Sequence, residues 1–269
     1  MYFADLHIHT KVSDGSLTAE EILKKAKKLG ITHLAFTDHD TTACAREHQQ
    51  LAERYGICAV PAVELSAYDY ESGRKVHILG YDYRTTEHIE ALGSETLRKR
   101  NENCLKQIEI LRSMGYTVPE EEIRKLGSGC IYKQHILDYL LMTGQSEALF
   151  GTIYRNIFKN KGPCDFDIAY PGAEEAVRAI KRDGGRAVLA HPGQQQNYAV
   201  LPSLVREGLD GIEWNHPSAG EEDRRKVEAY AEEYGLFLTG GSDFHGKYEN
   251  GGADLGTFPA HESSRCLFD

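Results

Sequence analysis

The chain has 269 residues, with 41 acidic against 31 basic side chains and a formal net charge of −10. Hydrophobic residues make up 41% and charged residues 27%, which are ordinary values for a globular protein and exclude wholesale disorder. No apolar run is long enough to span a membrane, and the N-terminus lacks the basic and apolar regions of a secretory signal. The 6 scattered cysteines include no C-x-x-C pair, as is typical of thiols in a reducing cytoplasm. We therefore expect a cytoplasmic protein without a membrane partner, and the acidic balance disfavours long nucleic acids as ligands.

Short β-like runs alternate with runs of helical period along most of the chain. The predicted strands span Phe3–Ile8, His33–Thr37, Ala59–Glu64, Val76–Tyr81, Ala187–Ala190, Gly211–Trp214 and Phe237–Gly241. The predicted helices span Thr18–Leu29, Thr42–Tyr55, Ala173–Arg182, Leu201–Glu207 and Glu221–Tyr234. Alternation of strands and helices favours an α/β fold with parallel strands, and the strand count is close to that of a barrel.

The segment between Tyr83 and Gly172 breaks this alternation because helical runs dominate it. Its predicted helices span Glu87–Met114, Glu120–Lys125, Lys133–Thr143 and Glu147–Phe158. We predict a barrel domain over residues 1–84 and 172–269, and a helical insertion over residues 85–171 that caps the carboxyl face of the barrel.

Histidines and carboxylates gather near the ends of the predicted strands. The first strand reads Asp5-Leu6-His7-Ile8-His9, so the two-residue period places Asp5, His7 and His9 on one face. Two imidazoles on a central strand are costly to bury unless something uses them, and a metal ion is the most economical user.

The loops and strands that follow carry comparable residues: Asp14, His39, Glu64, His77, His191, Asp243 and His245. The carboxyl ends of parallel barrel strands meet at one face, so these side chains can converge although they span most of the sequence. A single histidine of this kind is more often a core or surface residue. Six histidines and three carboxylates at corresponding positions instead predict a metal site.

Taken together, these motifs resemble the PHP (polymerase and histidinol phosphatase) superfamily, and within it the bacterial phosphoesterases that include nucleoside 3′,5′-bisphosphate phosphatases. The motifs are Asp5-x-His7-x-His9, Ser13-Asp14-Gly15, Thr37-Asp38-His39-Asp40, Val63-Glu64, Val76-His77-Ile78-Leu79-Gly80, Ala190-His191-Pro192 and Ser242-Asp243-Phe244-His245. The resemblance implies a distorted (β/α)7 barrel that binds up to three divalent ions at its carboxyl end.

The resemblance also implies how the ligands are shared among these ions. His7, His9, Asp243 and a bridging Glu64 would hold the first ion. Asp14, His39 and His245 would hold the second, and Glu64, His77 and His191 the third. Members of the family are described with Mn²⁺, Fe²⁺ or Zn²⁺, and the imidazole and carboxylate ligands here are compatible with each.

Clustered divalent ions suit the hydrolysis of phosphate esters, with metal-bound hydroxide as the nucleophile. Asp5, Asp38 and Asp40 are predicted to accept N–H hydrogen bonds from ligand histidines, with strand-end capping or turn formation as the alternative. His216, which follows the sixth predicted strand, is a candidate proton donor to the leaving group.

Basic residues in the insertion are candidate substrate ligands. Related phosphatases bind a substrate phosphate with an Arg/Asn pair and an Arg-x-His pair, and the matching positions here are Arg100 with Asn103 and Lys133 with His135. Lysine, which is a point charge rather than a bidentate fork, thus replaces one arginine. For the basic run that ends at Arg100, a solvated helix face is the alternative.

The leading hypothesis is a metal-dependent phosphomonoesterase for a small phosphorylated metabolite: a nucleotide, nucleoside bisphosphate or sugar phosphate. One alternative is a phosphodiesterase that acts on a cyclic ribose phosphate or on the 5′ ends of short RNA. A histidinol phosphatase is a further alternative, and outside enzymes an idle metal- or phosphate-binding module. The module is disfavoured because all nine ligand positions are filled. The sequence leaves the native metal and the oligomeric state open.

Overall fold

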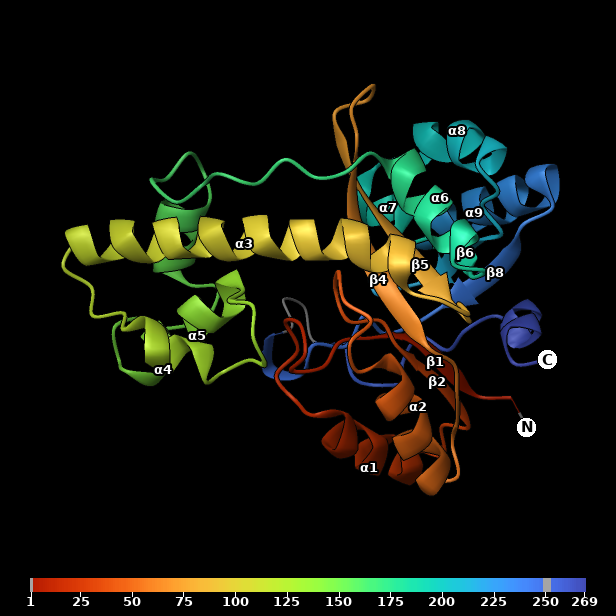
Figure 1. Cartoon of the computed structure of the whole chain (residues 1–269), viewed down its shortest axis with the longest axis horizontal. Helices are drawn as coiled ribbons and strands as arrows, with labels where there is room; N and C mark the ends of the chain where they lie inside the picture. Colours follow the sequence, from red (N-terminus) through yellow and green to blue (C-terminus); the bar gives the residue numbers. More distant parts are fainter. Residues whose placement is uncertain (1, 249–252) are drawn as a thin grey trace.

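The computed structural model describes residues 2–248 and 253–269. Residue 1 and residues 249–252, which fall within the predicted barrel ranges, lie outside the described residues. Two β-sheets, flanked by helices, form one end of the molecule (Figure 1). The first is parallel, with the order β1 (Ala4–Ile8), β2 (His33–Phe36) and β3 (Cys58–Ala59). The second has the order β4 (Ala62–Asp69), β5 (Arg74–Tyr81), β6 (Arg186–Leu189), β7 (Gly211–Asn215) and β8 (Phe237–Gly240).

The two sheets face each other across a shared core. A hydrophobic cluster draws Leu6 from β1, Ala35 from β2 and Val188 from β6. Tyr81 of β5 is fully buried, and its hydroxyl donates a hydrogen bond to the Leu6 carbonyl at 2.8 Å. Isolated parallel bridges also join Ile8 to Phe244 and His39 to Glu64. The fold is therefore a mixed α/β arrangement of two sheets, and the predicted distorted (β/α)7 barrel is not confirmed.

The strand predictions need two corrections in the region of the second sheet. The single strand predicted over Ala59–Glu64 is wrong, because the chain forms β3 and β4 with Pro61 between them. Proline lacks the N–H that a strand ladder requires. The expectation that all strands are parallel is also wrong, because β5 pairs antiparallel with both β4 and β6. The short turn at residues 70–73 permits only a hairpin between β4 and β5.

Helices cover the outer faces of both sheets (Figure 1). The first sheet packs against α1 (Ala19–Leu29) and α2 (Ala45–Arg54). The second packs against α6 (Ala173–Arg182), α8 (Leu201–Arg206) and α9 (Glu221–Tyr234). Short elements complete this part: α7 (Pro192–Gln195), η2 (Tyr198–Val200), η3 (Gly246–Tyr248) and η4 (Glu262–Leu267).

Helix α1 shows how the sequence sets these boundaries. Its predicted capping box is present, because the Thr18 hydroxyl accepts from the Glu21 N–H and the Glu21 carboxylate accepts from the Thr18 N–H. Gly30 ends the helix with a φ of 77°, a left-handed conformation that glycine adopts without steric cost.

The segment between β5 and α6 is helical and projects away from the sheets (Figure 1). It contains α3 (Glu87–Ser113), α4 (Glu120–Arg124), α5 (Lys133–Met142) and the π-helical turn η1 (Tyr154–Phe158). The helix predicted over Glu147–Phe158 is therefore wrong for its first half. The segment has its own hydrophobic cluster, which includes Ile108, Leu111, Ile136 and Phe158. Even α3, the longest of the described helices, is too charged to cross a membrane, and none of the others is long and apolar enough.

Candidate metal centre

The carboxylate of Glu64 lies at the centre of the predicted ligands. Its two oxygens approach a ring nitrogen of five histidines to within 3.3 Å: His7, His9, His39, His77 and His191. Glu64 lies near the amino end of β4 rather than at a carboxyl strand end, and His77 lies within β5. They still reach the other ligands because the bridge between His39 and Glu64 brings β4 against the loop that follows β2.

A first group of candidate ligands consists of His7, His9, Glu64 and Asp243. The Nε2 atoms of His7 and His9 lie 3.3 and 3.1 Å from Asp243 Oδ1, and 3.3 and 3.2 Å from Glu64 Oε2. The two histidines come from one face of the first strand and its end, as the two-residue period predicts. Asp243 comes from the loop after β8, so the group joins both sheets.

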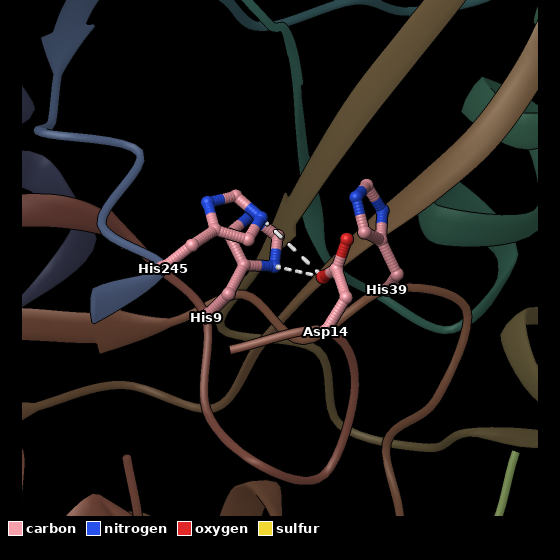
Figure 2. A group of neighbouring side chains, drawn as sticks. All are labelled: His9, Asp14, His39 and His245. Atoms are coloured by element: carbon pink, nitrogen blue, oxygen red, sulfur yellow. Dashed lines mark ion pairs between the residues drawn. The ribbon is translucent and has the colours of Figure 1, made fainter. Parts of the chain in front are cut away.

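A second group consists of His9, Asp14, His39 and His245, which converge from three loops (Figure 2). Asp14 Oδ1 lies 3.3 Å from His245 Nε2 and 3.8 Å from His9 Nδ1. The rings of His9 and His245 are stacked, with centroids 4.1 Å apart. His9 thus presents Nε2 to the first group and Nδ1 to the second.

A third group forms around the other oxygen of Glu64. His77 Nδ1 lies 2.8 Å and His191 Nε2 lies 3.1 Å from Glu64 Oε1. His39 also belongs here by distance, because His39, Glu64 and His77 offer ligand atoms within 4.8 Å of one another. The structure therefore brings all nine predicted ligands together, with His9 and His39 each facing two groups.

Several polar atoms in this cluster are buried without a hydrogen-bond partner. They are His7 Nε2, both ring nitrogens of His9, His39 Nδ1, His191 Nδ1 and Asp14 Oδ1. An unsatisfied buried polar group costs about 1–3 kcal/mol, and a cation bound among these lone pairs would remove that cost. The donor set of imidazoles and carboxylates therefore fits divalent metal ions.

The electrostatics of the cluster agree with this fit. Burial alone would raise the pKa of Glu64, yet the neighbouring histidines, His39 first among them, hold that pKa well below its ordinary value. The pKa of Asp243 is lowered in the same way, by His7 and His245 against its burial. Burial lowers the pKa of His39 to about 3, so this imidazole is neutral. Ionised carboxylates and the neutral imidazole of His39 are the ligand forms that a divalent ion binds. Against the effect of burial, the neighbouring carboxylates raise the pKa of His7 and that of His9, so an ion bound there would displace protons from these rings.

Sequence reasoning missed one residue of this centre, Glu213 in β7. Its Oε1 lies 3.0 Å from His7 Nδ1, and its Oε2 accepts the N–H of His191 at 2.8 Å. The signal that was available is a single acidic residue within the predicted strand Gly211–Trp214, a position where a charge is rarely buried unless it is paired.

Asp5 supports the centre through the backbone rather than through a ligand ring. Its carboxylate accepts hydrogen bonds from the Ser242 N–H at 2.9 Å, the Ser242 hydroxyl at 2.6 Å and the Gly256 N–H at 2.7 Å. Asp243, which follows Ser242 in the sequence, has a φ of 50°, which is uncommon outside glycine. Asp5 therefore holds the chain beside Asp243, a candidate ligand with a strained backbone.

Asp38 and Asp40 also bind loops rather than rings. Asp38 accepts from the Thr10 N–H at 2.8 Å and the Ser13 hydroxyl at 2.7 Å, and Asp40 accepts from the Ser66 N–H at 2.8 Å. The prediction that these aspartates orient ligand imidazoles is thus wrong within the described residues, and the alternative of strand-end capping and turn formation fits them.

Two cavities adjoin the cluster. The smaller, of about 200 Å³, includes the predicted substrate ligands Arg100, Asn103 and Lys133, together with Lys75 from β5. The larger, of about 410 Å³, is bordered by His216, Asp243 and His245 among others. The two cavities share three lining residues: Gln134, Phe150 and Tyr154.

Of the predicted substrate ligands, Arg100 lines the smaller cavity and His135 does not. Arg100 Nη2 donates to Asp40 Oδ2 at 3.0 Å and to Ser66 Oγ at 2.9 Å, and its guanidinium lies 5.1 Å from the Tyr132 ring centroid. It is therefore an anchored cation in the cavity wall rather than part of a solvated helix face. His135 is fully buried and its Nδ1 accepts the N–H of Tyr132, so it belongs to the start of α5 and not to the cavity lining.

His216, the candidate proton donor, lines the larger cavity. Its Nε2 lies 3.3 Å from Asp243 Oδ2, and its Nδ1 lies 2.7 Å from the Ser218 hydroxyl. Its ring centroid is 5.0 Å from that of His191. His216 is thus next to the cluster and hydrogen-bonded at both ring nitrogens.

Comparison with known proteins places this site in a family. The PHP domain family matches residues 5–186. The chain is 47% identical to phosphoribosyl 1,2-cyclic phosphate 1,2-diphosphodiesterase of Eggerthella lenta, over 91% of this chain and 94% of the relative. It is 31% identical to 3′,5′-nucleoside bisphosphate phosphatase of Chromobacterium violaceum, over 94% of this chain and 90% of the relative.

A solved structure agrees with this placement. A protein of Bifidobacterium adolescentis assigned to the metal-dependent phosphoesterases superposes with a TM-score of 0.89 at 29% identity, covering 98% of this chain and 94% of that one. The chain belongs to the PHP domain family. Its enzyme class is that of the metal-dependent phosphoesterases.

Proposed function

We propose that this enzyme hydrolyses a phosphate ester of a phosphorylated ribose, and that a cyclic ribose phosphate with a second phosphate group is the leading substrate class. The observation that carries the proposal is the pair of adjoining cavities. The larger one borders the ligands Asp243 and His245, and the smaller one is lined by the cations Lys75, Arg100 and Lys133. A substrate with two phosphate groups can place the reacting group beside the ligands and the other among these cations.

The named relatives support the same class. Both names describe ribose compounds with two phosphate groups, one a cyclic diester and the other a nucleoside bisphosphate. The diesterase shares 47% identity with this chain and the phosphatase 31%. We therefore rank the cyclic ribose phosphate ahead of a nucleotide, which reverses the order suggested by the sequence alone.

The proposed metal ligands are those that converge around Glu64. The first ion would be held by His7, His9, Glu64 and Asp243, the second by Asp14, His39 and His245, and the third by Glu64, His77 and His191. Divalent ions at such positions lower the pKa of a coordinated water and neutralise charge on phosphoryl oxygens. Mn²⁺, Fe²⁺ and Zn²⁺ each suit this mixture of imidazoles and carboxylates.

The chain's own residues account for the remaining requirements of the reaction. Hydrolysis forms a bond between a water oxygen and phosphorus and breaks the bond from phosphorus to a ribose oxygen, which must then gain a proton. We propose His216 as the donor of that proton, because it lines the larger cavity beside Asp243. Arg100, Asn103 and Lys133 would hold the distal phosphate.

We further propose that residues 85–171 act as a cap over the site. Lys133 and Gln134, at the start of α5, form part of the cavity walls, so this segment completes the substrate pocket. If residues 1–84 and 172–269 form the barrel domain, all nine proposed metal ligands belong to that domain and none belongs to the cap.

A substrate panel tests the proposal. The protein, supplied with Mn²⁺, is assayed on phosphoribosyl 1,2-cyclic phosphate, 3′,5′-bisphosphonucleosides, mononucleotides, 5′-phosphorylated short RNA and histidinol phosphate. Phosphorus NMR follows ring opening, and a colorimetric assay follows release of inorganic phosphate. We expect kcat/KM on the cyclic diester to exceed that on every other compound by at least about tenfold.

A preference for any other compound of the panel would contradict the proposal. A preference for a nucleoside bisphosphate, a mononucleotide or histidinol phosphate would make the enzyme a monoesterase, and a preference for RNA would make it a nuclease. The variant Asp243→Ala, purified in the same way, is the control for contaminating phosphatases.

A further inference from the structure

The helix α5 and the residue before it contact all three ligand-bearing loops that supply Asp14, His39 and His245. These ligands belong to the second group, shown with His9 in Figure 2. Each contact comes from a different side chain: Gln134, Tyr132 and Asp138.

The first contact joins Gln134 to a ligand directly. Gln134 Nε2 donates to Asp14 Oδ2 at 2.9 Å. The other oxygen of Asp14, Oδ1, is buried without a hydrogen-bond partner and lies 3.3 Å from His245 Nε2. The amide therefore occupies one carboxylate oxygen and leaves the other directed into the second group.

The second contact holds the backbone at His39. The hydroxyl of Tyr132 donates to the carbonyl oxygen of His39 at 3.3 Å. The Tyr132 side chain is almost fully buried and packs beneath the Arg100 guanidinium. Its position is thus fixed by packing, and the loop that carries His39 is fixed with it.

The third contact anchors the segment that carries His245. Asp138 is almost fully buried, and its carboxylate accepts from Lys247 Nζ at 2.9 Å and from the Tyr248 hydroxyl at 2.8 Å. Lys247 and Tyr248 follow His245 within a few residues, in η3. A buried carboxylate with two donors is a specific anchor, because removal of either side leaves a buried group unpaired.

The first group is held differently, by residues of the two sheets and their loops. Glu213 of β7 contacts His7, and Asp5 of β1 binds the N–H and hydroxyl of Ser242 beside Asp243. The two groups of ligands are thus supported by different parts of the chain.

From these contacts we propose that α5 is a positioning element for the second metal site, so that an ion held by Asp14, His39 and His245 binds tightly only while α5 is docked. The inference rests on the proposed function for the presence of metal ions, and on nothing about the substrate. Residues that orient metal ligands typically change metal affinity by about 10–100-fold when they are replaced.

Metal binding without turnover provides the test. Protein stripped with a chelator is titrated with Mn²⁺, and bound ions are counted by equilibrium dialysis with elemental analysis. The variants are Gln134→Leu, Tyr132→Phe and Asp138→Asn. The first two each remove one hydrogen bond, and the third removes the carboxylate charge and one of its two acceptor oxygens, all with little change in side-chain volume. Met142→Ala is the matched control, because Met142 lies on the same helix and is 64% exposed.

We expect the Gln134→Leu variant to bind one class of ion about 10–100-fold more weakly than the wild type, with the remaining ions unchanged. Tyr132→Phe and Asp138→Asn should weaken the same class, and Met142→Ala should not. Circular dichroism and thermal unfolding establish that each variant is folded. If Gln134→Leu does not fold, Tyr132→Phe decides the question, because it removes only a hydroxyl group.

Two results would overturn the inference. One is wild-type binding by the folded variants, and the other is an equal weakening of every ion. If the wild-type protein binds no divalent ion, the proposed metal-dependent function fails instead, so the two failures are distinguishable.

Discussion

His7 Nδ1 lies 3.0 Å from Glu213 Oε1, and both side chains are almost fully buried. The second oxygen of Glu213 accepts the N–H of His191 at 2.8 Å. One carboxylate therefore orients the ring of one proposed ligand and the backbone of another. Because Nδ1 of His7 is engaged in this way, its Nε2 is directed at Glu64 and Asp243.

Replacement of Glu213 by glutamine tests this relationship. The neutral amide is a weaker partner for an imidazole N–H, so we expect Glu213→Gln to lower Mn²⁺ affinity by about 10–100-fold and to lower turnover with it. Dialysis of the stripped protein against Mn²⁺ measures the affinity. Glu228→Gln, at a residue that accepts from the Trp214 indole, is the control. Unchanged metal affinity in the Glu213 variant would remove this residue from the metal centre.

Asp243 is the proposed ligand whose loss should be most damaging to turnover. Its Oδ1 approaches Nε2 of both His7 and His9, and it also borders the larger cavity. We expect Asp243→Ala to abolish turnover and to keep the circular dichroism spectrum of the wild type. Asp254→Ala, at an exposed position in the same part of the chain, is the control. A rate near that of the wild type would show that Asp243 is not part of the reacting site.

Lys133 should affect substrate binding more than chemistry. It lines the smaller cavity, and burial, with the nearby charge of Lys159, lowers its pKa. If it binds the distal phosphate, Lys133→Ala should raise KM more than it lowers kcat, because that contact forms equally in the ground state and the transition state. Lys106→Ala, at an exposed lysine outside the cavity lining, is the control. An unchanged KM would exclude Lys133 from phosphate binding.

The convergence of the nine proposed ligands could be predicted from the sequence, because each follows or lies within a recognisable strand. The two-residue period correctly placed His7 and His9 together. Glu213 could not be predicted in the same way, because a single acid within a strand gives no indication of its partner 206 residues away. Side-chain direction at a helix start is likewise not visible in the sequence, so His135 was expected in the pocket and lies buried in the helix start.

The antiparallel direction of β5 was also not predicted, because it depends on a turn that a side chain builds. The turn after Asp69 is built by that side chain, which accepts the N–H groups of Glu71 and Ser72. It makes β4 and β5 a hairpin, whereas strand and helix alternation elsewhere favoured parallel pairing. This error leaves the proposed ligand set intact, because His77 is opposite Ser66 and Glu64 lies two residues along on the same face of the hairpin. The distance between Glu64 Oε1 and His77 Nδ1 is 2.8 Å.

Asp183 joins the helical segment to the rest of the chain and makes stability depend on pH. Its carboxylate accepts the N–H groups of His88 and Ile89, at 2.9 and 2.8 Å, in the first turn of α3. Burial alone would raise its pKa, but these hydrogen bonds outweigh burial and lower the pKa. In the unfolded chain the pKa of this carboxyl is about 3.9. Because the pKa is lower in the folded state, the stabilisation is complete above that unfolded-state pKa and is lost as the pH falls through the folded-state pKa.

We therefore expect Asp183→Asn to lower the free energy of unfolding by about 1–3 kcal/mol at neutral pH, because one buried hydrogen-bond acceptor loses its charge. The difference from the wild type should narrow as the pH falls below about 4. Urea unfolding of the chelator-treated protein at neutral pH and below pH ~4 measures the free energy of unfolding of both proteins. Asp82→Asn, at an exposed position, is the control. A variant that differs equally from the wild type at the two pH values would show that the Asp183 charge does not cause the pH dependence.

We infer that the residues around Glu64 bind the metal ions on which hydrolysis of a cyclic ribose phosphate depends. The most direct measurement is ring opening of phosphoribosyl 1,2-cyclic phosphate by the chelator-treated protein, before and after Mn²⁺ is restored. We predict no turnover before, full turnover after, and no recovery in the Asp243→Ala variant. Turnover that survives removal of the metal, or that the Asp243→Ala variant retains, would contradict the claim.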